Sequence, residues 1–237
     1  MPEAPTVAQI ADSLADALDA ERYWREGDPA GVWVASERPV RRLGLRLEAG
    51  RAPYAWADGL DAVLLHRPFG LWPARFPAGV GVLAYHRALD EHLSVGHNPA
   101  LAGALGLAPE GEPLRRGGKT VGLVGALQAP LPLDALRQRL ADELGGTGAE
   151  VGPAPDAVER VALVGAMTEA LVAEAAERGA ALYVTGQIRP PGVEAASACG
   201  VRVVAVGQEQ GERWGLRRLG AMVRERWPSV ETVEVDG

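Results

Sequence analysis

Two short apolar segments in the first half of the chain each end on side chains that can bind a metal ion or move a proton. In DAVLLHRPFG, residues 61–70, a run of Val and Leu is followed by His66. In GVLAYHRALDEH, residues 81–92, a similar run is followed by His86 and Asp90. Such runs predict buried strands, and open α/β sheets bind their ligands outside the carboxyl ends of the strands. The sequence therefore predicts a site where these two segments end.

The residue types at this site indicate metal chemistry. His86 and Asp90 are four residues apart, so they converge on one point if the chain turns there. Glu212 also follows a predicted strand, and imidazole plus carboxylate is the ligand mix for first-row divalent metals. The alternative is that these are ordinary polar residues.

Several other site classes are excluded by motif. The sequence has no CxxC or HExxH zinc motif and no G-x-S-x-G nucleophile elbow. GGKT at 117–120 is not a P-loop, because it leads into a predicted strand, whereas a P-loop opens a helix.

Composition narrows the class of protein. The chain has 237 residues, 47% of them apolar, which is enough for a sizeable core. Its 24 Lys and Arg against 31 Asp and Glu give a net charge of −7, so we expect no nucleic-acid partner. The lone Cys199 is expected to be a small buried residue of a helix. The first residues lack a signal-peptide pattern and no apolar run is long enough for a membrane span, so we expect a cytoplasmic protein without a membrane partner.

The remaining segments alternate between helix and strand patterns. Thr6 and Gln9 form a capping box that predicts an amphipathic opening helix. The stretch 24–39 contains Gly and Pro breakers and is expected to be a loop that lies over the site. From residue 119 on, strands alternate with helices, which predicts a largely parallel sheet. SVETVEV at the end of the chain predicts an edge strand.

Several weak motifs occur in an order that resembles a known family. They are LLHRPFG, YHRALDEH, GHNPALAGALGL, VGLVGAL, ALYVTGQIR and GQEQGERWGLRRLGAMVRERWP. Together they span nearly the whole length and resemble the Nif-three-like proteins, also labelled GTP cyclohydrolase I type 2 homologues. The chain is identified by this resemblance as a divergent member.

The resemblance implies a dinuclear metal centre whose ligand positions carry over to five residues. Those positions are His66, Arg67, Asp90, Gln208 and Glu212. A guanidinium has no free lone pair, and an amide oxygen is a poor substitute for imidazole. The resemblance therefore implies at most one divalent ion, Zn, Mn, Fe or Mg, held by His66, Asp90 and Glu212, or no metal.

Three residues are expected beside this degenerate site in place of further ligands: Arg67, His86 and Gln208. We expect the guanidinium of Arg67 to replace a metal ion electrostatically between Asp90 and Glu212. The amide of Gln208 would then be a hydrogen-bonding neighbour.

The resemblance also implies the architecture and the assembly. The fold class is α/β and two-lobed, each lobe a mixed or largely parallel sheet flanked by helices, and the lobes face each other across a central site. We expect one lobe from residues 1–115 plus 205–237 and the other from residues 116–204. Family members are similar in forming hexamers, so the expected partners are further copies of this chain and an unknown small molecule.

Two functions follow from this interpretation. The first is a weak metal-dependent hydrolase with a bound water as nucleophile. The second is a non-catalytic ligand-binding or assembly protein that holds no metal. GTP cyclohydrolase activity is not expected, because two of the five implied ligands are missing.

Overall fold

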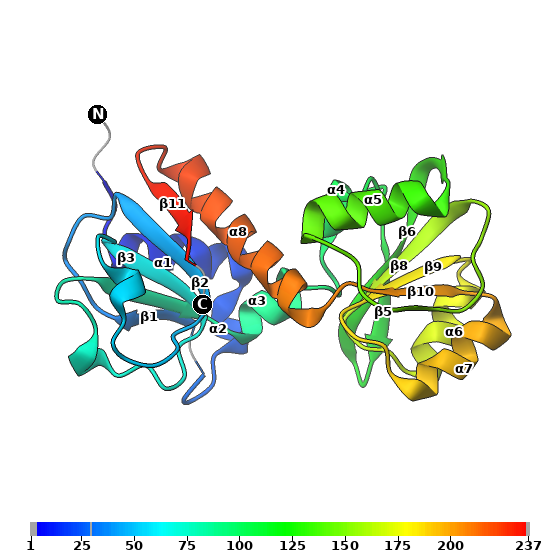
Figure 1. Ribbon diagram of the computed structural model, residues 1–237, viewed down its shortest axis with the longest axis horizontal. Coiled ribbons are helices and arrows are strands. Elements are labelled where there is room, and N and C mark those ends of the chain that lie inside the picture. The colour runs from blue at the N-terminus through cyan, green and yellow to red at the C-terminus, as the bar shows by residue number, and fades with distance from the viewer. Residues whose placement is uncertain (1–3, 29, 236–237) are drawn as a thin grey trace. The chain divides into compact units, whose positions relative to one another are not determined.

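The computed structural model describes residues 4–28 and 30–235, which form two compact units. The first unit contains the chain up to Asp90 and from Gly215 onward, and the second runs from Glu91 to Trp214. Each unit is built on its own β-sheet with flanking helices (Figure 1). The predicted α/β class is therefore confirmed. The predicted lobe boundaries, 1–115 plus 205–237 and 116–204, stay a prediction.

The first unit has a five-stranded sheet in the order β1-β4-β3-β2-β11. Strands β4, β3, β2 and β11 run parallel, and β1 joins β4 antiparallel at one edge. The strands are β1 Ala30–Val34, β2 Arg42–Glu48, β3 Ala62–Arg67, β4 Gly81–Tyr85 and β11 Glu231–Glu234. The helices that lie wholly in this unit are α1 Val7–Leu18, α2 Ala20–Tyr23 and the short 3-10 turns η1 Ala55–Ala57 and η2 Pro73–Arg75. Strand β11 pairs with β2 at the end of this order, which agrees with the predicted edge strand.

The opening helix forms as its capping box predicts. The Thr6 side chain accepts from the backbone N–H of Gln9, and the Gln9 side chain accepts from the backbone N–H of Thr6. The buried face of α1 includes Ile10 and Leu14. The hydroxyl of Tyr85 donates to the carbonyl of Ala11 at 2.7 Å, which fixes α1 to β4 next to the predicted site.

The stretch 24–39 is not entirely a loop, because it contains strand β1. Val32 and Trp33 are exposed at this edge of the sheet, and the register with β4 shifts between Val32 and Val34. The strand therefore lacks the alternation of buried and exposed residues that identifies strands in a sequence. Its backbone pairing with β4 holds it in place.

The second unit has a six-stranded sheet in the order β5-β6-β8-β9-β10-β7. Its strands are β5 Glu112–Arg116, β6 Lys119–Leu131, β7 Glu150–Val151, β8 Val158–Val164, β9 Leu182–Thr185 and β10 Arg202–Ala205. Its helices are α4 Pro99–Ala104, α5 Leu133–Leu144, α6 Glu169–Glu177 and α7 Pro190–Cys199. The unit boundaries fall inside two further helices, α3 Arg87–His92 and α8 Gln208–Arg226.

The sheet of the second unit is mixed, so the expectation of a largely parallel sheet from residue 119 is wrong. Among the described strands of this sheet, only β8, β9 and β10 pair in parallel. Strand β6 pairs antiparallel with β5 and with β8. Gly117 and Gly118 both have positive φ and form the turn between β5 and β6. The GGKT segment therefore forms a hairpin turn and leads into strand β6. It does not open a helix, which agrees with its exclusion from the P-loop class.

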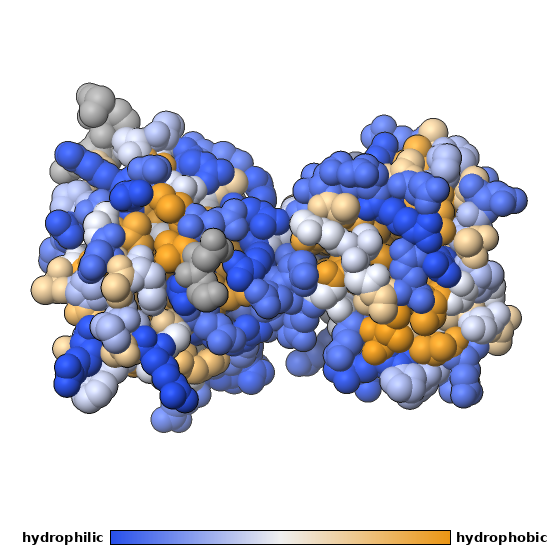
Figure 2. Space-filling view, in the orientation of Figure 1, coloured by the Kyte–Doolittle hydropathy of each residue, from blue (hydrophilic) through white to orange (hydrophobic). Residues whose placement is uncertain are grey.

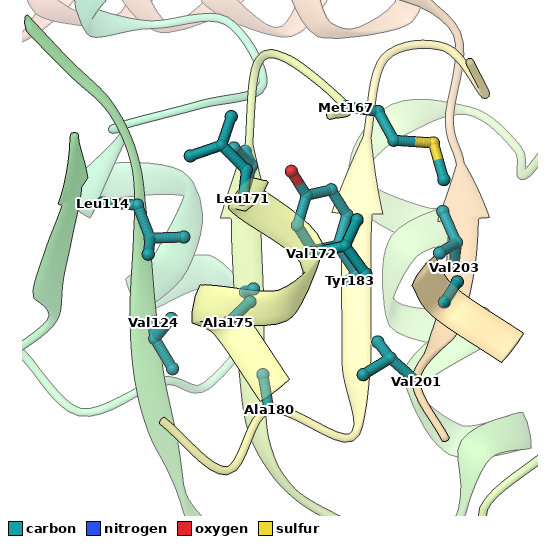
Figure 3. Packing of buried hydrophobic residues seen from close by; sticks show 13 residues of the cluster. Leu114, Val124, Met167, Leu171, Val172, Ala175, Ala180, Tyr183, Val201 and Val203 are labelled. Carbon is teal, nitrogen blue, oxygen red and sulfur yellow. The ribbon is translucent and has the colours of Figure 1, made fainter. Parts of the chain in front are cut away.

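Helices α6 and α7 of the second unit cover a core of small and branched side chains (Figure 3). Val172 and Tyr183 are fully buried in this cluster, and the Tyr183 hydroxyl donates to the carbonyl of Ala166 at 2.5 Å. Cys199, the last residue of α7, is exposed, so its predicted burial is wrong. It lies at the end of the helix, directly before the C-cap residue Gly200.

The visible faces of both units carry mainly hydrophilic residues (Figure 2). Among the described residues, every helix is too short or too polar to cross a membrane.

Candidate metal centre

Parallel pairing of β3 and β4 brings the first two predicted site residues to one edge of the sheet. Leu65 of β3 is in register with Ala84 of β4, so both strands end at the same level. His66 is the penultimate residue of β3, and His86 directly follows the last residue of β4. The geometry at the carboxyl ends of these strands is therefore the one that the two apolar segments predict.

The turn after β4 adds Asp90 to the pair of histidines. Helix α3 begins at Arg87, and the backbone N–H of Asp90 donates to the carbonyl of His86 at 3.0 Å. This first helical turn places His86 and Asp90 on the same side of the chain. The predicted convergence of these two residues is confirmed.

The side chains of His66, His86 and Asp90 meet around the Asp90 carboxylate. Nε2 of His66 lies 3.1 Å from Oδ1 of Asp90, and Nε2 of His86 lies 3.6 Å from Oδ2. One nitrogen or oxygen from each residue lies within 4.8 Å of the others. His66 is fully buried, while the Asp90 side chain is 35% exposed, so the group has a buried side and a side open to solvent within the first unit.

These spacings fit a single divalent ion. Two donor atoms that each lie about 2.1 Å from one ion are roughly 3 to 3.5 Å apart. The two nitrogen–oxygen distances at Asp90 are already close to that range. Two imidazoles and one carboxylate with an open side is the ligand set of catalytic zinc sites and of non-haem iron sites. His86, which the family resemblance places only beside the site, is thus a candidate ligand, as its residue type and position in the sequence indicate.

Two further side chains contact His86. Nδ1 of its ring lies 2.9 Å from Oδ1 of Asp28, and the side chain of Asp28 is only 11% exposed. The ring of Phe69 stands edge-on to the ring of His86, with centroids 5.3 Å apart. The segment before β1 therefore does reach the site, as predicted for the stretch 24–39, and it does so through Asp28. No motif in the sequence marks Asp28, since its contact depends on the pairing of β1 with β4.

Arg67 has an ion pair on the neighbouring strand. Its Nη1 lies 3.2 Å from Oε1 of Glu48, its register partner on β2. Successive residues of a strand point to opposite faces of the sheet, so Arg67 and His66 diverge. The expected electrostatic replacement of a metal ion by Arg67 stays a prediction.

The remaining predicted residues lie in the second unit. Nε2 of Gln208 donates to Oε1 of Glu212 at 3.0 Å, one turn apart on α8, and Glu212 is buried. The pairing agrees with the expected role of Gln208 as a hydrogen-bonding neighbour of that carboxylate. Glu212 as a metal ligand stays a prediction.

The sequence from residue 74 to residue 236 matches the family described as Duf34/NIF3 (NGG1p interacting factor 3). The chain belongs to the Duf34/NIF3 family. The resemblance drawn from the six motifs is confirmed. Of the three residues of the candidate metal centre, His66 precedes the matched range, while His86 and Asp90 lie inside it.

The sequences of related proteins align with nearly the whole length of this Duf34/NIF3 chain. A Pseudomonas aeruginosa protein named GTP cyclohydrolase 1 type 2 homolog is 29% identical, with 98% of this chain and 96% of that protein covered. A protein of the same name from Allochromatium vinosum is 28% identical, with 90% and 89% covered. A solved structure from Thermus thermophilus superposes with a TM-score of 0.71 at 23% identity, covering 98% of both chains, which shows the fold.

Proposed function

We propose that this Duf34/NIF3 protein binds one divalent metal ion through His66, His86 and Asp90 and uses it for hydrolysis. The observation that supports this proposal is the approach of both imidazole Nε2 atoms to opposite oxygens of the same carboxylate, at 3.1 Å and 3.6 Å. A structural zinc site has four protein ligands, whereas three ligands with an open side is typical of a catalytic site.

A bound divalent ion supplies Lewis acidity, which lowers the pKa of a water molecule and polarises a substrate oxygen. The residues around it have separate tasks. His66 is buried at the end of a central strand and gives the site a rigid side. Asp90 brings the one negative charge of the three ligands and, being partly exposed, faces the side from which substrate enters. The edge of Phe69 limits the movement of the His86 ring.

The charge of this ligand set favours an anionic or strongly polar substrate. Two neutral imidazoles and one carboxylate leave a divalent ion with a net positive charge at the open side. A phosphoester or carboxylic ester oxygen matches that charge. The substrate is a small molecule rather than nucleic acid, since the chain carries a net charge of −7.

The test uses protein loaded with zinc, manganese or iron(II) and chromogenic phosphodiester and carboxylic ester substrates. We expect slow, metal-dependent hydrolysis that EDTA abolishes and that Asp90→Ala lowers at least 100-fold. Asp61→Asn is the matched control. Asp61 accepts hydrogen bonds from the backbone N–H groups of Arg41 and Arg42, away from the site. Hydrolysis that is equal in Asp90→Ala and the parent protein would refute the hydrolase proposal.

The second function, a non-catalytic binding or assembly protein, is a distinct outcome of this experiment. It is supported by Arg67, whose guanidinium stands where the resemblance implies a second histidine and cannot ligate a metal. Protein that binds no metal and hydrolyses none of the substrates would favour this alternative.

A further inference from the structure

We propose that Asp28 is a positioning residue that fixes the tautomer and the orientation of His86 for metal binding. This inference rests on the proposed metal centre. Oδ1 of Asp28 lies 2.9 Å from Nδ1 of His86, which is the ring nitrogen opposite to the one that approaches Asp90. A carboxylate behind a ligating histidine orients the ring and raises the basicity of its free nitrogen.

The register of the sheet explains why Asp28 reaches this position. In the antiparallel pair of β1 and β4, Ala30 is opposite Tyr85. Asp28 lies two residues before Ala30, and His86 directly follows Tyr85, so the pairing of β1 with β4 brings the segment that contains Asp28 close to His86. The backbone N–H of Asp28 also donates to the carbonyl of Arg25 at 2.9 Å, which holds the segment in a tight turn.

The two distances at His86 decide which nitrogen carries the proton. At 2.9 Å, Nδ1 and Oδ1 of Asp28 are within ordinary hydrogen-bond range, whereas 3.6 Å between Nε2 and Oδ2 of Asp90 is outside it. A neutral imidazole has one N–H donor and one acceptor. The proton therefore lies on Nδ1, and the lone pair of Nε2 faces His66 and Asp90.

Arg87 completes the arrangement on the far side of Asp28. Its Nε donates to Oδ2 of Asp28, so both carboxylate oxygens are engaged by different residues. The guanidinium balances the negative charge of Asp28, and Asp28 stays a hydrogen-bond acceptor for His86 instead of turning toward the metal. The ion pair between Asp28 and Arg87 would by itself be enough to attach the segment before β1 to helix α3. The contact with His86 is the part that serves the site.

The first measurement is metal affinity, determined by competition with a chromophoric chelator for Zn²⁺. We expect Asp28→Ala to weaken binding about 10- to 100-fold, the range typical of such supporting carboxylates. Asp28→Asn keeps the size and an acceptor oxygen, and we expect it to weaken binding less than Asp28→Ala. Asp61→Asn is again the matched control and should leave metal affinity unchanged.

The second measurement reads the tautomer directly in metal-free protein. The chain has four histidines, so ¹⁵N spectra of the imidazoles can be assigned with single substitutions. At about pH 9, above the ordinary imidazole pKa, we expect the proton of His86 on Nδ1 in the parent protein and a shift toward Nε2 in Asp28→Ala. A merely structural role for Asp28 would leave the tautomer unchanged.

The outcomes separate this inference from the proposed function. A parent protein that binds no metal but shows the expected tautomer change contradicts the metal centre and supports the positioning of His86. A parent protein that binds metal, with equal affinity in Asp28→Ala, overturns the role of Asp28 and leaves the metal centre intact. Arg87→Met removes the ion pair with Asp28. If this variant loses as much metal affinity as Asp28→Ala while His86 keeps its proton on Nδ1, the positioning role of Asp28 would also be overturned.

Discussion

Nε2 of His66 lies 3.1 Å from Oδ1 of Asp90, although the two residues are 24 positions apart in the chain and belong to different elements. His66 is fixed by β3, and Asp90 by the first turn of α3. The contact joins a fully buried imidazole to a partly exposed carboxylate. His86 lies beside this pair and completes the group of three residues proposed to bind a metal ion.

The first prediction concerns GTP. Metal-loaded protein should turn over GTP no faster than the Asp90→Ala variant. The proposed ligand set binds a single ion, and Arg67 and Gln208 replace two of the ligands that the family resemblance implies. Chromatographic analysis of the reaction products checks this. Metal-dependent GTP turnover by homogeneous protein that Asp90→Ala abolishes would show that a single ion is sufficient.

The second prediction concerns Arg67, which pairs with an exposed carboxylate on β2. Glu48 is 67% exposed, and a surface ion pair of this kind contributes about 0–1 kcal/mol. Glu48→Gln should therefore change the free energy of unfolding by less than about 1 kcal/mol. If Arg67 also compensates the carboxylate of Asp90, Arg67→Ala should cost more, roughly 2 kcal/mol or above.

Denaturant unfolding of these two variants, with and without added Zn²⁺, separates the roles of Arg67. Zn²⁺ should partly restore the stability of Arg67→Ala by binding the folded state. Equal, small effects of Arg67→Ala and Glu48→Gln would limit Arg67 to its pair with Glu48.

The third prediction is a pH dependence in the second unit. Hydrogen bonds from Arg137, together with those from Arg202, hold the pKa of Glu150 below its ordinary value. A depressed carboxyl pKa means that the unfolded chain binds the proton more readily than the folded one. The stabilisation is therefore fully present above the ordinary pKa of about 4.5 and is lost as the pH falls through the lower folded-state pKa.

Glu150→Gln should accordingly be destabilised by roughly 1–3 kcal/mol at pH 7, since two guanidinium groups lose their charged partner. The difference from the parent protein should shrink as the pH falls below about 4. Denaturant unfolding at several pH values measures it. A difference that is constant from pH 7 to pH 3 would mean that the Glu150 charge is not the stabilising feature.

The fourth prediction is self-association. Trp24 and Trp72 are 59% and 58% exposed, and exposed aromatic side chains are enriched in interfaces between proteins. We expect light scattering at micromolar concentration to give a multiple of the 24.9 kDa chain mass, with a hexamer as the expected assembly. A mass equal to one chain would contradict it.

Much of the first unit could be predicted because its signals are local. The capping box of Thr6 and Gln9, the apolar runs before His66 and His86, and the four-residue spacing to Asp90 each depend on neighbouring residues. Strand β1 and Asp28 could not be predicted, because an edge strand is held by backbone pairing that leaves little trace in its side chains.

The second unit shows a different limit of sequence interpretation. Alternating strand and helix patterns predicted a largely parallel sheet, but direction depends on which strands become neighbours. The turn at Gly117 and Gly118 turns β6 back along β5, and β8 then pairs antiparallel with β6. Cys199 is exposed as the last residue of α7, and the small residues of this segment do not show how far along the helix the covered part extends.

The most direct test of the metal centre is the metal content of the protein. Protein purified without chelator, incubated with Zn²⁺ and desalted should contain one ion per chain by inductively coupled plasma mass spectrometry. His66→Ala, His86→Ala and Asp90→Ala should each lower this toward zero, while Asp61→Asn should retain it. A parent protein with no bound ion, or an Asp90→Ala variant that still holds one, would contradict the centre formed by His66, His86 and Asp90.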